Sequence, residues 1–224
     1  MLHKTSGIVL NFIRYSESSI ITKIYTEKFG LQSYIVNGVR SKSSRSKIAL
    51  FQPLTILDLV VYYKQQSSIQ RISESTCKFP FKSIPFDQKK VCLAIFISEI
   101  LIKCLKEEIE NKELFQFLQD AIHNLDVTLS EYENFHLIFL IDLAYFLGFG
   151  PSSVEDIVKR EVLSAISKEE IDFINQLLNK QTNQIKTSNT TRRNILGHLL
   201  TFYQTQIENF GEVNSVEILK EILK

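Results

Sequence analysis

Thr55-Ile-Leu-Asp-Leu-Val-Val-Tyr-Tyr63 has the residue pattern of a β-strand. Its side chains alternate between two faces, with Leu57, Leu59 and Val61 on one face and Asp58 on the other. A period of two is expected of a strand that buries one of its faces. The stretch therefore predicts one strand of a sheet that is packed on a single side.

Four further β-rich runs surround this strand, and polar or glycine-containing turns separate them. The five expected strands are Gly7–Tyr15, Ser19–Thr26, Leu31–Val39, Thr55–Tyr63 and Ser68–Thr76. Lys28-Phe-Gly30 and Gln65-Gln-Ser-Ser68 are typical of hairpin connections. Five antiparallel strands in so short a segment fit a small closed barrel, which leaves no sheet edge free.

The periodicity becomes helical after Pro85. Apolar side chains recur at helical spacing from Leu93 to Cys104 and again from Leu114 to Leu125, so each expected helix has one apolar stripe. Leu137–Leu147 is apolar almost all round, as expected of a helix at the centre of a bundle. The sequence therefore predicts an α+β protein, with a five-stranded β-barrel over residues 1–80 and an all-α domain over residues 81–224.

Short signals predict where the helices begin and end. Ser130-x-x-Glu133 and Ser167-x-x-Glu170 match the capping box of a helix start. Gly148-Phe-Gly-Pro151 is expected to end the central helix, because proline disfavours helix in the residue before it. The polar stretch Gln181–Thr191 predicts a loop, and a helix is expected over Arg192–Asn209.

Charge divides the chain where the periodicity changes. Residues 1–80 hold 11 Lys and Arg against 4 Asp and Glu, a net charge of +7, and the remaining 144 residues carry a net charge of −6. A basic segment followed by an acidic one suggests a polyanion-binding module joined to a second function, although charge also drifts along ordinary chains.

Searches for catalytic motifs exclude several classes of enzyme. The sequence has no Gly-x-x-x-x-Gly-Lys-Ser/Thr loop for a nucleoside triphosphate, no Gly-x-Ser-x-Gly elbow and no His-Glu-x-x-His pair. Its four histidines have no partners at metal-ligand spacing. We therefore expect no cofactor, no metal and no enzymatic activity.

The cysteines and the apolar runs indicate the compartment. Cys77, Cys92 and Cys104 are odd in number and scattered, which argues against a disulfide framework and for a reducing environment. The amino terminus lacks the apolar core of a signal peptide, and the longest apolar run is too short to span a bilayer. We expect a cytoplasmic protein with no membrane partner.

One segment has the composition of a phosphate-binding loop. Val36-Asn-Gly-Val-Arg-Ser-Lys-Ser-Ser-Arg-Ser-Lys47 contains four cations, four serines and no acid. Such cations neutralise phosphates, and serine hydroxyls donate to phosphate oxygens, but solvated loops share this composition. The nearby aromatic residues are Phe12, Tyr15, Tyr34, Tyr62 and Tyr63. Their rings could stack on unpaired bases, or they could belong to the core or rim of the barrel.

Four blocks in matching order and spacing resemble the amino-terminal signature of the bacterial RecO family. They are Tyr15-Ser-Glu-Ser-Ser19, Tyr25-Thr-Glu-Lys-Phe-Gly30, Asn37-Gly-Val-Arg-Ser-Lys-Ser-Ser44 and Phe51-Gln-Pro-Leu54. Weaker similarity continues through Leu147-Gly-Phe-Gly-Pro151 and from Arg193 to Tyr203, so the resemblance covers most of the chain.

The resemblance implies an OB-fold followed by a helical domain in a recombination and repair mediator. Proteins of this family bind single- and double-stranded DNA and anneal complementary strands without ATP. With RecR they load RecA onto strands coated with single-strand binding protein, whose acidic, Phe-ended tail they bind through the helical domain. Similarity to such proteins also implies association with the nucleoid.

This sequence departs from the family at one place. Many relatives place a Cys-x-x-Cys pair after the Gly-x-x-Pro turn, where further cysteines complete a zinc ribbon. No cysteine follows Cys104 here. Because zinc needs four soft or imidazole ligands, we expect no structural zinc.

Candidate site residues follow from the basic segment and the resemblance together. For DNA they are the loop cations Arg40, Lys42, Arg45 and Lys47, with Arg14, Lys23 and Arg71 on the barrel as weaker candidates. For the partner tail, Arg192 and Arg193 precede an apolar stripe and could pair with its carboxylates, or could form a solvated helix start.

Two other functions fit the same sequence. The helical domain could act as a protein-binding scaffold while the barrel has little affinity for DNA. The barrel could instead bind RNA or an oligosaccharide, as OB-folds also do.

Overall fold

The computed structural model describes residues 1–39, 45–106, 109–163, 165–181 and 187–223. The chain divides into two compact units, residues Met1–Val127 and Thr128–Lys224. The first unit contains the barrel and two long helices, and the second contains the remaining helices. The change from strands to helices near residue 80 therefore lies inside the first unit.

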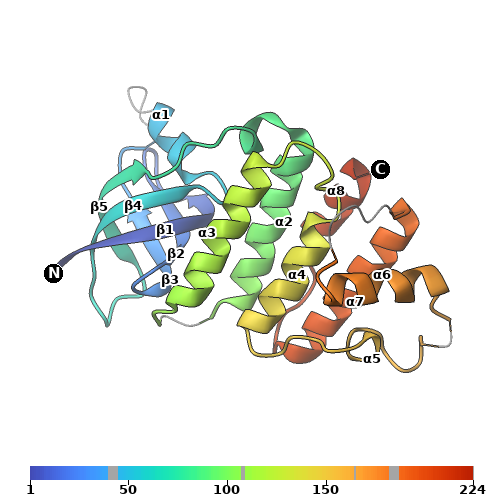
Figure 1. Cartoon of the computed structure of the whole chain (residues 1–224). Helices are drawn as coiled ribbons and strands as arrows, with labels where there is room; N and C mark the ends of the chain where they lie inside the picture. Colours follow the sequence, from blue (N-terminus) through green and yellow to red (C-terminus); the bar gives the residue numbers. More distant parts are fainter. Residues whose placement is uncertain (40–44, 107–108, 164, 182–186, 224) are drawn as a thin grey trace. The chain divides into compact units, whose positions relative to one another are not determined.

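Five strands form a closed barrel in the order β1-β2-β3-β5-β4 (Figure 1). They are β1 (Leu2–Arg14), β2 (Ile20–Thr26), β3 (Gly30–Val36), β4 (Ile56–Tyr62) and β5 (Gln70–Cys77). Every pair of neighbours is antiparallel except β3 and β5, which are parallel. This is a five-stranded Greek-key barrel of the OB type, and the predicted fold class is confirmed.

Four of the predicted strands agree with the structure to within three residues, but β1 begins at Leu2, five residues earlier than predicted. Leu2–Ser6 pairs with the neighbouring strand β4 and so closes the barrel, from Leu2 opposite Tyr62 to Ser6 opposite Asp58. The local sequence does not reveal this pairing, because the partner strand lies far along the chain.

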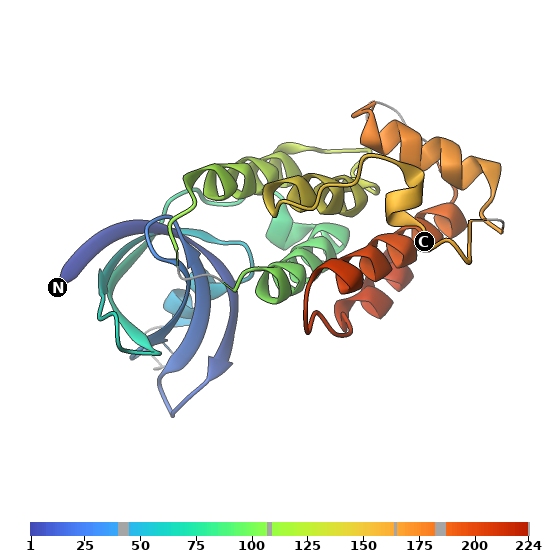
Figure 2. The ribbon, with the colours of Figure 1, turned by 90° about the horizontal axis from the view of Figure 1, so that it is seen from below.

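The barrel interior is filled by side chains from all five strands. One buried cluster contains Val9, Ile24, Tyr34, Leu57 and Val61. Figure 2 shows the strands curving around this common interior. Gly7 faces the same interior, since a Cβ added there would lie 2.6 Å from Ile24 Cγ2 and 2.8 Å from Leu59 Cδ1. The glycine is therefore required by close packing.

A short helical segment connects β3 to β4 and completes this core. It consists of α1 (Arg45–Ile48) and the 3-10 turn η2 (Ala49–Phe51). Phe51 is fully buried in the barrel cluster. The residues that precede Phe51 are therefore held at one end of the barrel.

Two long helices belong to the same unit as the barrel. They are α2 (Gln88–Cys104) and α3 (Lys112–Val127), and they bury the predicted apolar stripes. The Phe115 ring of α3 lies 6.1 Å from the Tyr25 ring of β2, and Figure 1 shows α3 beside the barrel.

A buried polar network joins the chain leaving the barrel to both helices. The 3-10 turn η3 (Ile84–Phe86) begins where the backbone N–H groups of Lys82, Ser83 and Ile84 donate to the Asp126 carboxylate, at 2.8–3.0 Å. Lys90 Nζ donates to Ser83 Oγ at 2.6 Å. This network explains why the first compact unit extends to Val127.

The described residues of the second unit form helices and the loops that connect them. Its elements are α4 (Phe135–Phe146), α5 (Val154–Ile157), α6 (Lys168–Leu178), α7 (Asn189–Gln206) and α8 (Ser215–Ile222). The helix α4 is buried almost all round, as predicted, and Tyr203 of α7 donates a hydrogen bond to the Leu140 carbonyl at 2.6 Å. Gly148, with φ +85°, follows the end of α4 at the predicted place.

The helix-start predictions had mixed outcomes. The capping box at Ser167 is confirmed, because Glu170 N donates to Ser167 Oγ and Ser167 N donates to Glu170 Oε2. The predicted box at Ser130 is wrong, since α4 begins at Phe135 with Asn134 as its N-cap.

The start of α7 was also predicted too late. The helix begins at Asn189, where Ser188 Oγ caps it by accepting from Thr191 N at 3.0 Å. The middle of the predicted loop, residues 182–186, lies outside the described residues. Among the helices that are described, none has the length and apolar character needed to cross a membrane.

Candidate nucleic-acid interface

The loop predicted to bind phosphate is only partly placed. Arg40, Lys42 and the side chain of Arg45 lie outside the described residues. Lys47 is exposed on α1, immediately before the segment that enters the barrel core. The four loop cations therefore remain candidates, of which Lys47 has a known position.

An outer row of side chains crosses all five strands on the outside of the barrel. It follows the register from strand to strand, and its members are Ile13, Ile21, Ile35, Arg71, Tyr62 and Leu2. The neighbours of these residues along the strands, such as Ile20, Val61 and Ile72, point into the core. The row begins at Ile13 of β1 and returns to the same strand at Leu2, eleven residues earlier, because strands in a closed barrel are staggered.

Two of the predicted barrel cations share this outer face. Arg71 is an exposed member of the outer row and lies opposite Ile35 and Tyr62. Lys23 is half-buried and lies opposite Asn11 and Ser33, one step along the same face. The sheet thus brings together two cations that are 48 residues apart in sequence.

Arg14 is placed differently from the other two barrel cations. It pairs with Ile20, whose side chain belongs to the barrel core, so Arg14 has the inward register at the last residue of β1. It is nevertheless exposed, because the strand ends there. Arg14 therefore extends from the rim of the barrel and does not join the outer row.

Two of the five candidate stacking residues are exposed. Tyr15 is 61% exposed beside the end of β1, and Tyr62 is 43% exposed in the outer row. Tyr34 is fully buried, and burial raises the pKa of its hydroxyl. The Tyr63 ring stacks on Phe29 with centroids 4.2 Å apart, and Phe12 packs against the barrel core.

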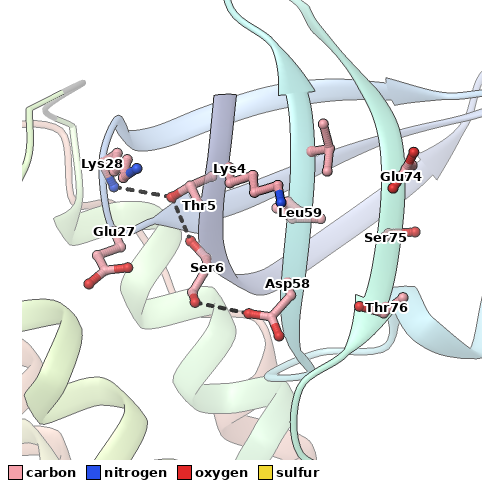
Figure 3. A pocket seen from close by; sticks show the side chains of 11 residues that line it. Lys4, Thr5, Ser6, Glu27, Lys28, Asp58, Leu59, Glu74, Ser75 and Thr76 are labelled. Atoms are coloured by element: carbon pink, nitrogen blue, oxygen red, sulfur yellow. Dashed lines mark hydrogen bonds between the residues drawn. The ribbon is translucent and has the colours of Figure 1, made fainter. Parts of the chain in front are cut away.

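Farther along the outside of β1, β4 and β5, the barrel has a different electrostatic character. A groove of about 430 Å³ on β1, β4 and β5 is lined by three carboxylates, those of Glu27, Asp58 and Glu74, and by two lysines (Figure 3). Ser6 Oγ donates to Asp58 Oδ1 at 3.2 Å and accepts from Lys78 Nζ at 2.9 Å. Carboxylates repel phosphates, so this groove disfavours a nucleic-acid backbone.

The outer row and its neighbour Lys23 carry no acidic side chain, although Glu74 lies one step from Arg71 along β5 and Glu17 lies in the adjoining β1–β2 connection. The strand face therefore combines two cations, an exposed tyrosine and exposed apolar side chains. Periodicity separates the two faces of each strand, but it does not show which face a helix covers. For that reason the sequence did not show that Ile13, which is 60% exposed, belongs to the uncovered outer face.

The two arginines proposed for a partner tail are tied into the second unit. Arg192 is only 7% exposed, and its Nε and Nη1 donate to the side-chain oxygens of Asn134 and Asn189 at 2.9 and 2.6 Å. Arg193 is half-buried and donates from Nη2 to the Lys220 carbonyl at 2.6 Å. The sequence suggested rim cations or a solvated helix start at both positions, whereas Arg192 is a buried structural residue.

Burial also controls the charge of a histidine in this region. Burial and the positive charge of Arg192 together lower the pKa of His136 to about 3. His136 is therefore neutral in the folded protein across the physiological range, and it adds no cation to this surface.

Comparisons with known proteins cover almost the whole chain. Residues 1–81 match the family described as Recombination protein O N terminal, and residues 85–213 match Recombination protein O C terminal. The chain is 34% identical to the DNA repair protein RecO of Phocaeicola vulgatus over 99% of both chains. It is 35% identical to the DNA repair protein RecO of Flavobacterium psychrophilum over 98% of both chains. The chain therefore belongs to the RecO family.

Proposed function

We propose that this protein acts in DNA repair and recombination as a mediator that binds single- and double-stranded DNA. In this proposal residues 1–80 bind DNA and residues 81–224 bind partners. The protein anneals complementary strands without ATP, and together with RecR it helps to load RecA onto DNA coated with single-strand binding protein. It works in the cytoplasm at the nucleoid, and it is not an enzyme.

The observation that carries this proposal is the outer face of the barrel. Lys23 and Arg71 lie on the outer face of the strands with the exposed ring of Tyr62, and the acidic groove begins at Val60 and Glu74, the next step along β4 and β5. Cations neutralise the phosphates and release counterions, while an aromatic ring stacks on a base of any sequence.

Annealing requires a surface of this kind. Two strands must approach each other with their charges screened, and their bases must remain free to pair. A shallow cationic face meets both requirements, whereas a deep base-specific pocket would hold the bases back. Nucleotide hydrolysis is not required for this chemistry.

Partner binding is assigned to the helical segment as part of the same proposal. An acidic tail ending in phenylalanine needs a cation for its carboxylates and an apolar surface for its ring. Arg193 is the more accessible of the two arginines, and it lies beside the carbonyl of Lys220 on α8. Arg192 would support this position from beneath through Asn134 and Asn189.

A salt titration separates the mediator from a scaffold with little DNA affinity. We expect the protein to bind oligonucleotides with an affinity that falls steeply as salt rises. A variant with Arg40, Lys42, Arg45 and Lys47 all changed to Ala should have a salt slope flatter by up to about 3.6 on duplex DNA, at roughly 0.9 per phosphate contact. Absence of DNA binding by the unaltered protein would favour the scaffold, and an unchanged slope would exclude the loop as the contact.

A further inference from the structure

An apolar groove of about 720 Å³ lies in the first unit, between one end of the barrel and the helix α2. Its walls come from Phe12 of β1, from Leu50 and Pro53 before β4, and from Phe81 and Ile95 on the helical side. None of the described residues that line it carries a charge. The groove thus presents aromatic, proline and aliphatic surfaces of the kind on which flat rings stack.

The polar groups of the groove are few and uncharged. The side chains of Asn11 and Gln52 carry amides, each with a donor and an acceptor, and Thr55 adds a hydroxyl. Paired donors and acceptors of this kind match the edges of unpaired nucleobases. An apolar slot with a few polar groups at its margin is typical of a site for small planar molecules.

The groove adjoins both groups of candidate DNA-binding cations. Asn11 lies directly opposite Lys23 in the register of β1 and β2, so one edge of the groove meets the outer face. Ala49 and Leu50 directly follow α1, which carries the exposed Lys47. A DNA backbone that runs from Lys47 to Lys23 would therefore pass along the groove.

We infer that this groove binds unpaired bases of single-stranded DNA, while the cations on either side of it hold the phosphates. The inference rests on the proposed function, because it assigns a subsite of the same DNA interface. A base can enter an apolar groove only when it is not paired, so the groove confers preference for single strands. Duplex DNA would use the cations alone.

The test compares two strands that have equal numbers of phosphates, an oligothymidylate and a fully abasic strand. We expect the unaltered protein to bind the oligothymidylate more tightly by about tenfold or more, as stacking energies indicate. Ile95 is 41% exposed in the groove, and the Ile95→Glu variant should lose the preference for the oligothymidylate. Ile109→Glu adds the same charge at a residue that is 63% exposed and does not line the groove, and it should keep the preference.

A second variant keeps the inference open to refutation. Gln52→Ala changes an exposed residue without adding charge, and it should reduce the preference several-fold even if Ile95→Glu fails to fold. If both variants keep the full preference and still bind DNA, the groove is not a base site, although the proposed function stands. If the unaltered protein binds neither strand, the proposed function itself is wrong.

An acidic peptide that ends in phenylalanine serves as the competing ligand. In the proposed arrangement its affinity is the same for the unaltered protein and for Ile95→Glu. If Ile95→Glu loses the peptide and keeps the preference for bases, the groove is a peptide site and the inference is overturned.

Discussion

His136 shows how a single residue couples the helical unit to pH. It is 1% exposed near the start of α4, and burial together with Arg192 lowers its pKa from 6.5 to about 3. In the unfolded chain this histidine takes up a proton below pH 6.5, whereas in the folded chain it does not. Its burial therefore costs stability as the pH falls from 6.5 towards 3.

The lowered pKa of His136 predicts how the free energy of unfolding changes with pH. Between pH 6 and pH 5 its contribution should lower the free energy of unfolding by about 1.4 kcal/mol per pH unit. Urea denaturation of the full chain at a series of pH values measures the slope. His136→Gln should remove that contribution, and His123→Gln, at an exposed position, should keep it. Equal slopes for the unaltered protein and His136→Gln would show that His136 titrates normally.

Individual residues were the hardest feature to predict from sequence. Arg192 was interpreted as a rim cation ahead of an apolar stripe, or as part of a solvated helix start, and it is in fact buried with Asn134, 58 residues away, as a hydrogen-bond partner. Ser130 matched a capping box by spacing alone, yet the helix begins at Phe135. For Arg192, a contact with a distant segment decides the outcome.

At the scale of elements, the strand β1 depends on a glycine. A Cβ at Gly7 would meet Ile24 Cγ2 at 2.6 Å and Leu59 Cδ1 at 2.8 Å inside the closed barrel. Gly7→Ala should therefore lower the free energy of unfolding by about 1–3 kcal/mol, the usual cost of overpacking. Gly197, on the exposed side of α7, has no atom within 4 Å of its added Cβ.

Gly197→Ala is thus the matched control for the strand variant. It should raise stability by up to about 1 kcal/mol, since alanine favours helix over glycine. Thermal denaturation measures both changes, and opposite signs are expected. A Gly7→Ala variant as stable as the unaltered protein would mean that the barrel interior has room for the added methyl group.

We expect the cations on β2 and β5, Lys23 and Arg71, to contact DNA. Lys23→Gln with Arg71→Gln should flatten the dependence of log affinity on log salt by roughly 1.4 on single strands, at about 0.7 per phosphate contact. Lys4→Gln with Lys28→Gln removes the same charge from the groove of Figure 3, which three carboxylates also line, and should change the slope little. Equal effects from the two pairs would mean that DNA responds only to net charge.

Strands and helices were largely predictable because their periodicity is local. The alternation of Leu57, Leu59 and Val61 specified β4, and the stripes from Leu93 and Leu114 specified α2 and α3. The early start of β1 was missed, since Leu2–Ser6 becomes a strand only by pairing with β4. The outer row was also missed, because its membership depends on the register between strands.

At the scale of the whole molecule, the compact units do not follow the change of periodicity. The basic barrel ends near residue 80, but α2 and α3 belong to its unit through Asp126, Lys90 and the contact of Phe115 with Tyr25. Family membership was predictable from four short blocks, since their order and spacing carry information that composition does not. The proposed activity requires the barrel to supply the DNA-binding face and the helices to supply partner contacts.

The most direct test of this account is annealing of complementary oligonucleotides coated with single-strand binding protein, in the absence of ATP. The account predicts that the unaltered protein accelerates annealing, that the Lys23→Gln, Arg71→Gln variant loses most of the acceleration, and that the Lys4→Gln, Lys28→Gln variant keeps it. If the unaltered protein binds these strands and yet fails to accelerate their annealing, the account of this protein as an ATP-independent annealing mediator is contradicted.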